Sequence, residues 1–454
     1  MSWLGPVCFA LLSFLGSLQP QNAGLEPDFL LATAGFLCWG AAALWAPASF
    51  SLGHLSLMGI FLTTYSLMIA LPSLYIRGVH PELGGDWFIP GVMVVFPCTC
   101  AAWFVTFRSL GLSRGATRTY FLKQVRVEPG PWPPRAWGFL VALCLGLALV
   151  HISLSPVSPL SLLIEGVSAK ELAEAREASL KTIPGVGIKY LLSWLMSVLF
   201  PLASLWAFGR AIKERNLRWC LLATAVILLA LGYATFTLAK APAAMLVGML
   251  LLVAFLLRNK PVSPILMVLG ATVVLLIPAG LVAAISNAGP LEVVLGILRR
   301  LLYVPAEALV YYFEAFDAEH PFLEGRSINL FSRLFYGEPP FPLSSFIYQL
   351  IHEGGLKTGL SNAAFVGTMW ANFAGPGLLV GPIVVGILIG LSEASIVIGE
   401  KTLLKVCLHS MLCLQVFFLS SRSVTVAMLT GGWVPAICLV LTLGWLFKRL
   451  ERNS

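Results

Sequence analysis

Charged residues are scarce in this chain of 454 residues. Only 11% are Asp, Glu, Lys or Arg, whereas 58% are hydrophobic and the mean hydropathy is +0.88. Soluble domains carry about 25% charged residues, so the composition excludes that class. Runs of roughly 20 apolar residues recur, which is the length that a helix needs to cross a bilayer. We therefore expect an all-α polytopic membrane protein with about 12 transmembrane helices.

The chain also lacks a basic region before its first apolar run and a small-residue cleavage site after it. That run is therefore predicted to be a span and not a signal peptide. We expect one integral membrane domain over 1–454. Its spans are predicted near 3–19, 28–47, 52–75, 87–107, 136–157, 188–209, 220–239, 241–257, 263–285, 376–398, 403–420 and 424–446.

Cysteine is absent from the hydrophilic loops. Eight of the nine cysteines lie inside expected spans and Cys220 begins one, so the sequence indicates neither a disulfide framework nor a zinc site. No internal repeat is found either, and this disfavours a transporter built from paired halves. Neither a metal nor a cofactor is expected.

Acidic residues are especially rare on one side of the expected membrane. That side holds 17 basic and 5 acidic residues, a balance of +12, and the other side has a balance of −4. The positive-inside rule then places both termini in the cytoplasm and the late segment 286–362 outside. The basic balance indicates contact with membrane lipids and not with nucleic acid.

The late extracytoplasmic loop, 286–362, gathers charged and aromatic side chains. From Leu291 to Phe316 they recur at helical spacing, which predicts one amphipathic helix with a polar stripe. The stripe consists of Arg300, Tyr303, Glu307, Tyr311 and Glu314. Two interpretations stay open. The helix lies in the membrane interface with this face in water, or the stripe lines a site for a charged, hydroxyl-rich ligand.

Three short motifs in and after this loop carry a family resemblance. They are His320-Pro-Phe-Leu-Glu-Gly-Arg-Ser327, Gly359-Leu-Ser-Asn362 and Trp370-Ala-Asn-Phe-Ala-Gly-Pro-Gly377. From about Lys240 onward the arrangement resembles the Wzy-type oligosaccharide repeat-unit (O-antigen) polymerases. Members tend to show Asn-Phe-Gly-x-x-Gly at the last motif, where Ala374 intervenes in this chain. Arg326 and Gly337 also fit an Arg-x10-Gly spacing of some members.

The resemblance implies a glycosyltransferase of polysaccharide and lipopolysaccharide biosynthesis in the bacterial inner membrane. Such an enzyme joins undecaprenyl-diphosphate-linked oligosaccharides at the outer face, and a chain-length regulator is a further partner that the resemblance allows. The leaving diphosphate needs cationic donors, which arginine supplies bidentately without a metal. The candidates for this contact are Arg300, Arg326 and Arg422, with Lys240 and Arg299 behind them.

The transfer also needs a group that accepts the proton of the attacking hydroxyl. Glu307 is preferred because it follows Arg300 by two helical turns on the striped face. The alternatives are Glu314, Asp317, His320 and His352, which the sequence does not rank. Tyr303, Tyr311 and Trp370 are candidates for stacking on sugar rings, and Asn362 is a further candidate for sugar binding.

Three other functions remain open from the sequence. A lipid-linked glycosyltransferase with a divalent metal would use the acid-x-acid pair Glu26 and Asp28. An O-antigen ligase shares the outer loop and the lipid-diphosphate donor, so only its acceptor differs. A lipid-linked oligosaccharide transporter would carry charges buried within its spans.

Overall fold

The computed structural model describes residues 52–113, 115–154, 186–236, 240–285, 289–316, 320–352, 359–361 and 363–452. Within these residues the secondary structure is helical and contains no β-strand. The contacts divide the chain into two compact units. The first comprises 1–118, 295–394 and 416–425, and the second comprises 119–294, 395–415 and 426–454. The expected spans 3–19 and 28–47 and the pair Glu26 and Asp28 lie outside the described residues.

Seven described helices are long and apolar enough to cross a membrane. They cover Leu57–Val79, Phe88–Ser109, Trp132–Leu154, Gly187–Glu214, Leu217–Ala234, Phe365–Val397 and Val424–Glu451. Three shorter apolar helices cover Ala241–Leu257, Ile265–Leu276 and Leu403–Phe418. The expectation of an α-helical membrane protein is thus confirmed. The count of 12 spans, the single domain and the sidedness stay predictions.

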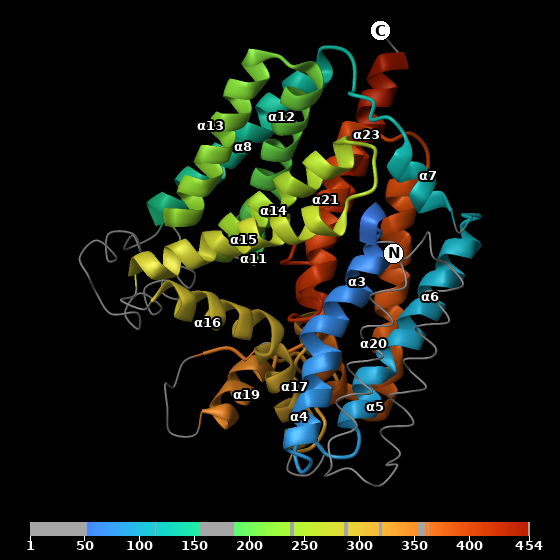
Figure 1. The fold of residues 1–454 in the computed structure, drawn as a ribbon, viewed down its shortest axis with the longest axis vertical. Coiled ribbons are helices and arrows are strands. Elements are labelled where there is room, and N and C mark those ends of the chain that lie inside the picture. Colours follow the sequence, from blue (N-terminus) through green and yellow to red (C-terminus); the bar gives the residue numbers. More distant parts are fainter. Residues whose placement is uncertain are drawn as a thin grey trace. The chain divides into compact units, whose positions relative to one another are not determined.

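The first unit packs its helices around α17. Its elements include α3 (Leu57–Tyr65), the π-helical turn η2 (Ser66–Ala70), α4 (Leu71–Val79), α5 (Phe88–Met93), α6 (Val95–Ser109), α17 (Val304–Glu314) and most of α20 (Phe365–Val397). Glycines in α5 and α20 allow these helices to approach α17 closely. A Cβ at Gly91 of α5 would lie 2.7 Å from Phe313, and one at Gly367 of α20 would lie 2.8 Å from Leu309. Figure 1 shows α17 beside α4.

The predicted single helix from Leu291 to Phe316 is two helices. They are α16 (Pro290–Leu302) and α17, and they meet at Tyr303. Pro305 explains the break, because proline has no N–H for the preceding turn and its ring clashes with that turn's carbonyl. Proline is tolerated in the first turn of a helix, and Pro305 begins α17 in this way. The prediction of one continuous stripe was therefore wrong.

Helix α20 is kinked at Ala374, whose φ of 51° and ψ of −140° lie outside the helical region. Pro376 follows and cannot donate to the carbonyl four residues earlier. The late loop upstream of α20 contains three more short elements: α18 (Asn329–Phe331), the π-helical turn η5 (Ser332–Tyr336) and α19 (Leu343–Ile351). None of these is long enough to cross a membrane.

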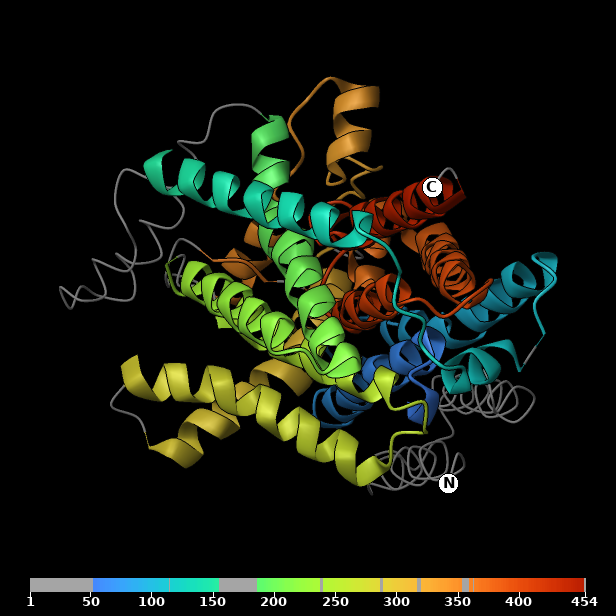
Figure 2. The ribbon, with the colours of Figure 1, turned by 90° about the horizontal axis from the view of Figure 1, so that it is seen from above.

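The second unit is a bundle in which α12 contacts α8, α13 and α14 (Figure 2). Its helices include α8 (Trp132–Leu154), α11 (Val186–Trp194), η3 (Leu195–Leu199), α12 (Phe200–Glu214), α13 (Leu217–Phe236), α14 (Lys240–Leu257), α15 (Pro264–Ile285) and α23 (Trp433–Arg452). Most of α21 (Leu403–Phe418) also belongs to it. The short helices α7 (Ala116–Leu122) and α22 (Val424–Met428) cross the boundary between the units.

Candidate functional site

Three of the predicted site residues meet where α16 ends and α17 begins. A guanidinium nitrogen of Arg299 lies 3.7 Å from a carboxylate oxygen of Glu307, and the same guanidinium lies over the Tyr303 ring at 5.9 Å. Tyr303 also makes an edge contact with Tyr75 of α4, with 6.5 Å between ring centroids. Burial, followed by the negative charge of Glu307, raises the pKa of Tyr303. The helix break therefore gathers a cation, a carboxylate and two phenol rings.

Arg300 was predicted to act beside Glu307, but the carboxylate pairs with Arg299. Arg300 is exposed, and it makes no ion pair within the part of the chain that the structure describes. Tyr311 and Glu314 lie further along α17 and are half-buried. Asp317 and Asn362 lie outside the described residues, as does the side chain of Lys240.

A second group lies in the loop around α18. The guanidinium of Arg326 lies 4.8 Å from the centroid of the Tyr336 ring. The Tyr336 hydroxyl donates to the Glu324 carbonyl at 3.0 Å, which fixes the ring beneath the guanidinium. Arg326 is exposed and, among the described residues, faces no carboxylate within ion-pairing distance. Its N–H groups remain available to an anion.

The two histidine candidates are exposed and contact aromatic rings. His320 makes an edge contact with Phe346 at 5.0 Å between centroids. His352 makes a similar contact with Tyr348 at 4.3 Å. Neither residue has an acidic partner in the described ranges, so no acid orients a particular ring nitrogen.

Trp370, predicted to stack on sugars, is only 2% exposed. One face of its ring stacks on Phe313 at 4.9 Å between centroids and an interplanar angle of 16°. Phe322 packs its edge against the same ring at 5.3 Å. Trp370 therefore packs α17 and the late loop together, and its ring offers little surface to a ligand.

Arg422 lies in the turn between α21 and α22 and is half-buried. Its guanidinium lies 4.1 Å from the centroid of the Phe418 ring, and burial lowers the pKa of the side chain. Among the residues described, no carboxylate lies within ion-pairing distance of it. Burying a cation is costly unless an opposite charge accompanies it. An anion beside this side chain would offset that cost.

Backbone contacts bring the turn of Arg422 to the start of α20 and near α17. The Phe365 N–H donates to the carbonyl of Leu419 at 3.3 Å. The Tyr312 hydroxyl donates to the carbonyl of Ser361 at 3.1 Å, and burial raises the pKa of Tyr312 to about 12. Segments from three parts of the late sequence thus meet in the first unit.

Two buried polar side chains were not predicted from the sequence as part of a site. Asn372 is 1% exposed and bonds to Ser327 of the late loop. Glu393 is 2% exposed and accepts hydrogen bonds from Trp103 and Thr117. The available signal was an amide and a carboxylate inside an apolar run, because polar groups in such runs need partners.

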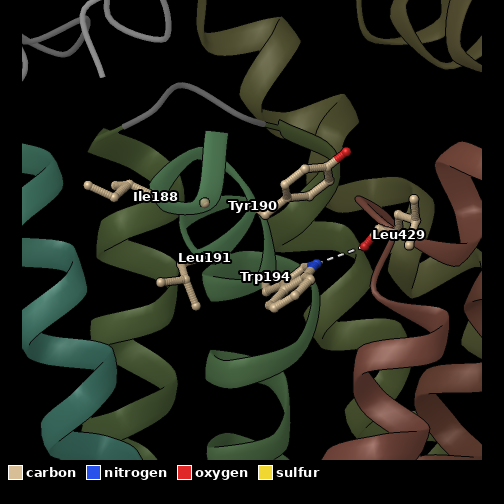
Figure 3. A pocket seen from close by; sticks show the side chains of 6 residues that line it. Ile188, Tyr190, Leu191, Trp194 and Leu429 are labelled. Atoms are coloured by element: carbon tan, nitrogen blue, oxygen red, sulfur yellow. Dashed lines mark hydrogen bonds between the residues drawn. The ribbon is translucent and has the colours of Figure 1, made fainter. Parts of the chain in front are cut away.

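The second unit contains an open apolar groove of about 660 Å³ (Figure 3). It is lined by Gly187, Ile188, Tyr190, Leu191, Trp194 and Leu429. The Trp194 indole N–H is already used, since it donates to the Leu429 carbonyl at 2.7 Å. The groove therefore offers hydrocarbon contact and almost no polar recognition.

Chemically, the first unit can bind anions and move a proton. Arg326 and Arg422 present guanidinium groups without acidic partners in the described residues, and Glu307 offers a partly exposed carboxylate held by Arg299. No cluster of three or more metal-ligating side chains is found among the described residues. No protein-family model matches the chain, and neither does any curated protein or solved structure.

Proposed function

We propose that this protein is a glycosyltransferase that joins lipid-diphosphate-linked oligosaccharides into a surface polysaccharide, as Wzy-type polymerases do. The observation that carries the proposal is the half-buried guanidinium of Arg422, which lies over Phe418 without a carboxylate near it in the described chain. It is situated in a short turn between apolar helices. A lipid-linked diphosphate brings negative charge to the membrane surface, where such a turn is placed by the proposed topology.

The substrates are undecaprenyl-diphosphate-linked oligosaccharides, and the site faces the outside of the bacterial inner membrane in this proposal. The charge partition of the sequence supports that orientation. Both termini are then cytoplasmic, and a chain-length regulator is a candidate partner.

In the proposed reaction, a hydroxyl of one lipid-linked glycan attacks the anomeric carbon of another. The bond between that carbon and the diphosphate oxygen breaks, and the diphosphate leaves with the electron pair. Arg422 donates to the leaving oxygens, and such preorganised donors lower the barrier because negative charge grows there. Glu307 accepts the proton of the attacking hydroxyl. Arg299 orients the Glu307 carboxylate through their ion pair.

The test measures glycan transfer by the purified protein in vesicles that contain lipid-linked repeat units. Arg422→Met should lower the transfer rate by about a hundredfold, which is typical of losing one charge-stabilising donor. Arg422→Lys should restore only part of the rate, because an ammonium lacks the planar bidentate fork.

Arg135→Met is the matched control. Arg135 also lies over an aromatic ring, at 5.1 Å from the centroid of Trp132, but it is exposed. The Arg135→Met protein should transfer glycans at the rate of the wild type. Polymer formed at full rate by Arg422→Met, at wild-type abundance, would overturn the proposal.

A further inference from the structure

The outer loop is docked on the part of α20 that precedes the kink. The Leu323 N–H donates to the Ala371 carbonyl at 2.9 Å, and Phe322 packs against Trp370. The kink at Ala374 makes this docking possible. A helix that ends there leaves carbonyls of its last turn free to accept bonds from another segment.

Asn372 holds the loop at a second point by its side chain. Its amide oxygen accepts from the Ser327 N–H at 3.2 Å, and its amide nitrogen donates to the Ser327 hydroxyl at 2.6 Å. The second amide hydrogen goes to the Thr368 carbonyl at 2.7 Å. Because both hydrogens and the oxygen are used, the amide has one orientation. We call these bonds the Asn372 clasp.

The clasp lies next to Arg326 in the sequence. The Arg326 N–H donates to the Leu323 carbonyl at 2.9 Å, and the Arg326 carbonyl accepts from the Phe341 N–H at 2.8 Å. The backbone is thus fixed on both sides of the residue, while its guanidinium lies on the Tyr336 ring. The side chain is exposed at the end of a rigid turn.

We propose that Asn372 is a positioning residue that holds Arg326 in the orientation needed to bind the anionic part of the substrate. This inference rests on the proposed function. Asn372 is 1% exposed, and burying its amide would be costly without the bonds that it makes to Ser327 and Thr368. Arginine binds phosphate or carboxylate through a planar fork, so a shifted backbone loses the bidentate geometry.

The first experiment measures tryptic cleavage after Arg326 in the purified full-length protein. Cleavage requires the segment to leave its docked position, so Asn372→Ala should speed it by about tenfold. The matched control is Asn329→Ala, which removes an exposed amide whose oxygen accepts from the Arg333 guanidinium at 2.8 Å. Equal cleavage of Asn372→Ala and the wild type would show that the clasp does not hold the loop.

The second experiment is a double-mutant cycle of Asn372→Ala with Arg326→Ala, read as kcat/KM for glycan transfer. Asn372→Ala alone should lower kcat/KM by about tenfold or more, because small misplacements of binding groups are costly. In the Arg326→Ala background the same change should have less than about a twofold effect, since the two residues act as one unit. If the double variant instead lost kcat/KM by the product of the two single losses, Asn372 would act independently of Arg326, and the inference would fail.

A milder variant covers the case in which Asn372→Ala does not fold. Ser327→Ala removes only the hydroxyl that accepts from Asn372 and keeps the Ser327 N–H bond. Ser327→Ala should lower kcat/KM less than Asn372→Ala does, and this effect should also vanish in the Arg326→Ala background. An inactive wild type in the same vesicles would refute the proposed function instead, and the tryptic experiment would still decide whether the clasp holds the loop.

Discussion

Replacing Glu393 should destabilise the first unit more than replacing any exposed acid of the late loop. Glu393 lies in α20 with 2% of its surface exposed. One carboxylate oxygen accepts from the Trp103 indole N–H at 3.1 Å and the other from the Thr117 hydroxyl at 2.9 Å. The Ser56 hydroxyl and the Met58 N–H also bond to this carboxylate. It therefore connects α20 with α6, α7 and the start of α3.

The expected loss follows from these bonds. A hydrogen bond to a charged group contributes about 1.5–3 kcal/mol, and a donor left buried without a partner costs about 1–3 kcal/mol. Glu393→Ala removes the carboxylate and leaves the Trp103 N–H buried. We therefore expect the free energy of unfolding to fall by about 3–5 kcal/mol. Glu393→Gln keeps a carbonyl for Trp103, and the Thr117 hydroxyl can turn to accept from the new amide. Glu393→Gln should therefore lower the free energy of unfolding by about 1–2 kcal/mol.

The assay is unfolding of the purified protein in detergent micelles, followed by tryptophan fluorescence during titration with a denaturing detergent. Glu338→Ala replaces an exposed acid of the late loop. This variant is the control, and it should unfold at the same detergent concentration as the wild type. The order of stability should be wild type, then Glu393→Gln, then Glu393→Ala. Unfolding of Glu393→Ala together with Glu338→Ala would refute the reasoning that the buried carboxylate is needed.

Two further predictions concern the second unit and the topology. The Lys401 ammonium donates to the Phe121 and Leu256 carbonyls and to the Asn259 amide, at 2.7, 3.0 and 3.0 Å. Lys401→Met should cost about 3–5 kcal/mol in the same unfolding assay, and an unchanged midpoint would contradict this. A cysteine at exposed Glu338 should react with an impermeant thiol reagent in intact cells and one at exposed Gln124 should not, whereas the reverse labelling would invert the proposed orientation.

Composition and run length were sufficient to predict a helical membrane protein. A bilayer admits only backbone that satisfies its own hydrogen bonds, so long apolar runs leave few alternatives to helices. The charge partition was less informative about individual residues. It counted Glu393 as a cytoplasmic charge, but the structure buries this carboxylate under an indole and a hydroxyl. A sum of charges contains no information on which of them are solvated.

The break between α16 and α17 could have been predicted, because Pro305 is visible in the sequence and interrupts a helix. Helical periodicity alone predicts a single stripe from Leu291 to Phe316, whereas the proline divides this segment into two helices. The break changes the chemistry. It turns Arg299 toward Glu307, although the spacing had favoured Arg300 as the neighbour.

The remaining contacts of the site join residues that no local pattern connects. Trp103 and Glu393 are 290 positions apart, and Ser327 and Asn372 are 45 apart. Sequence shows which arginines are present, but the fold decides what each one faces. Arg299 faces a carboxylate, whereas Arg326 and Arg422 lie on aromatic rings. An aromatic ring leaves the guanidinium N–H groups free to bind an anion, whereas a carboxylate accepts hydrogen bonds from them. These partners therefore favour Arg326 and Arg422 over Arg299 for contact with the diphosphate of the proposed substrate.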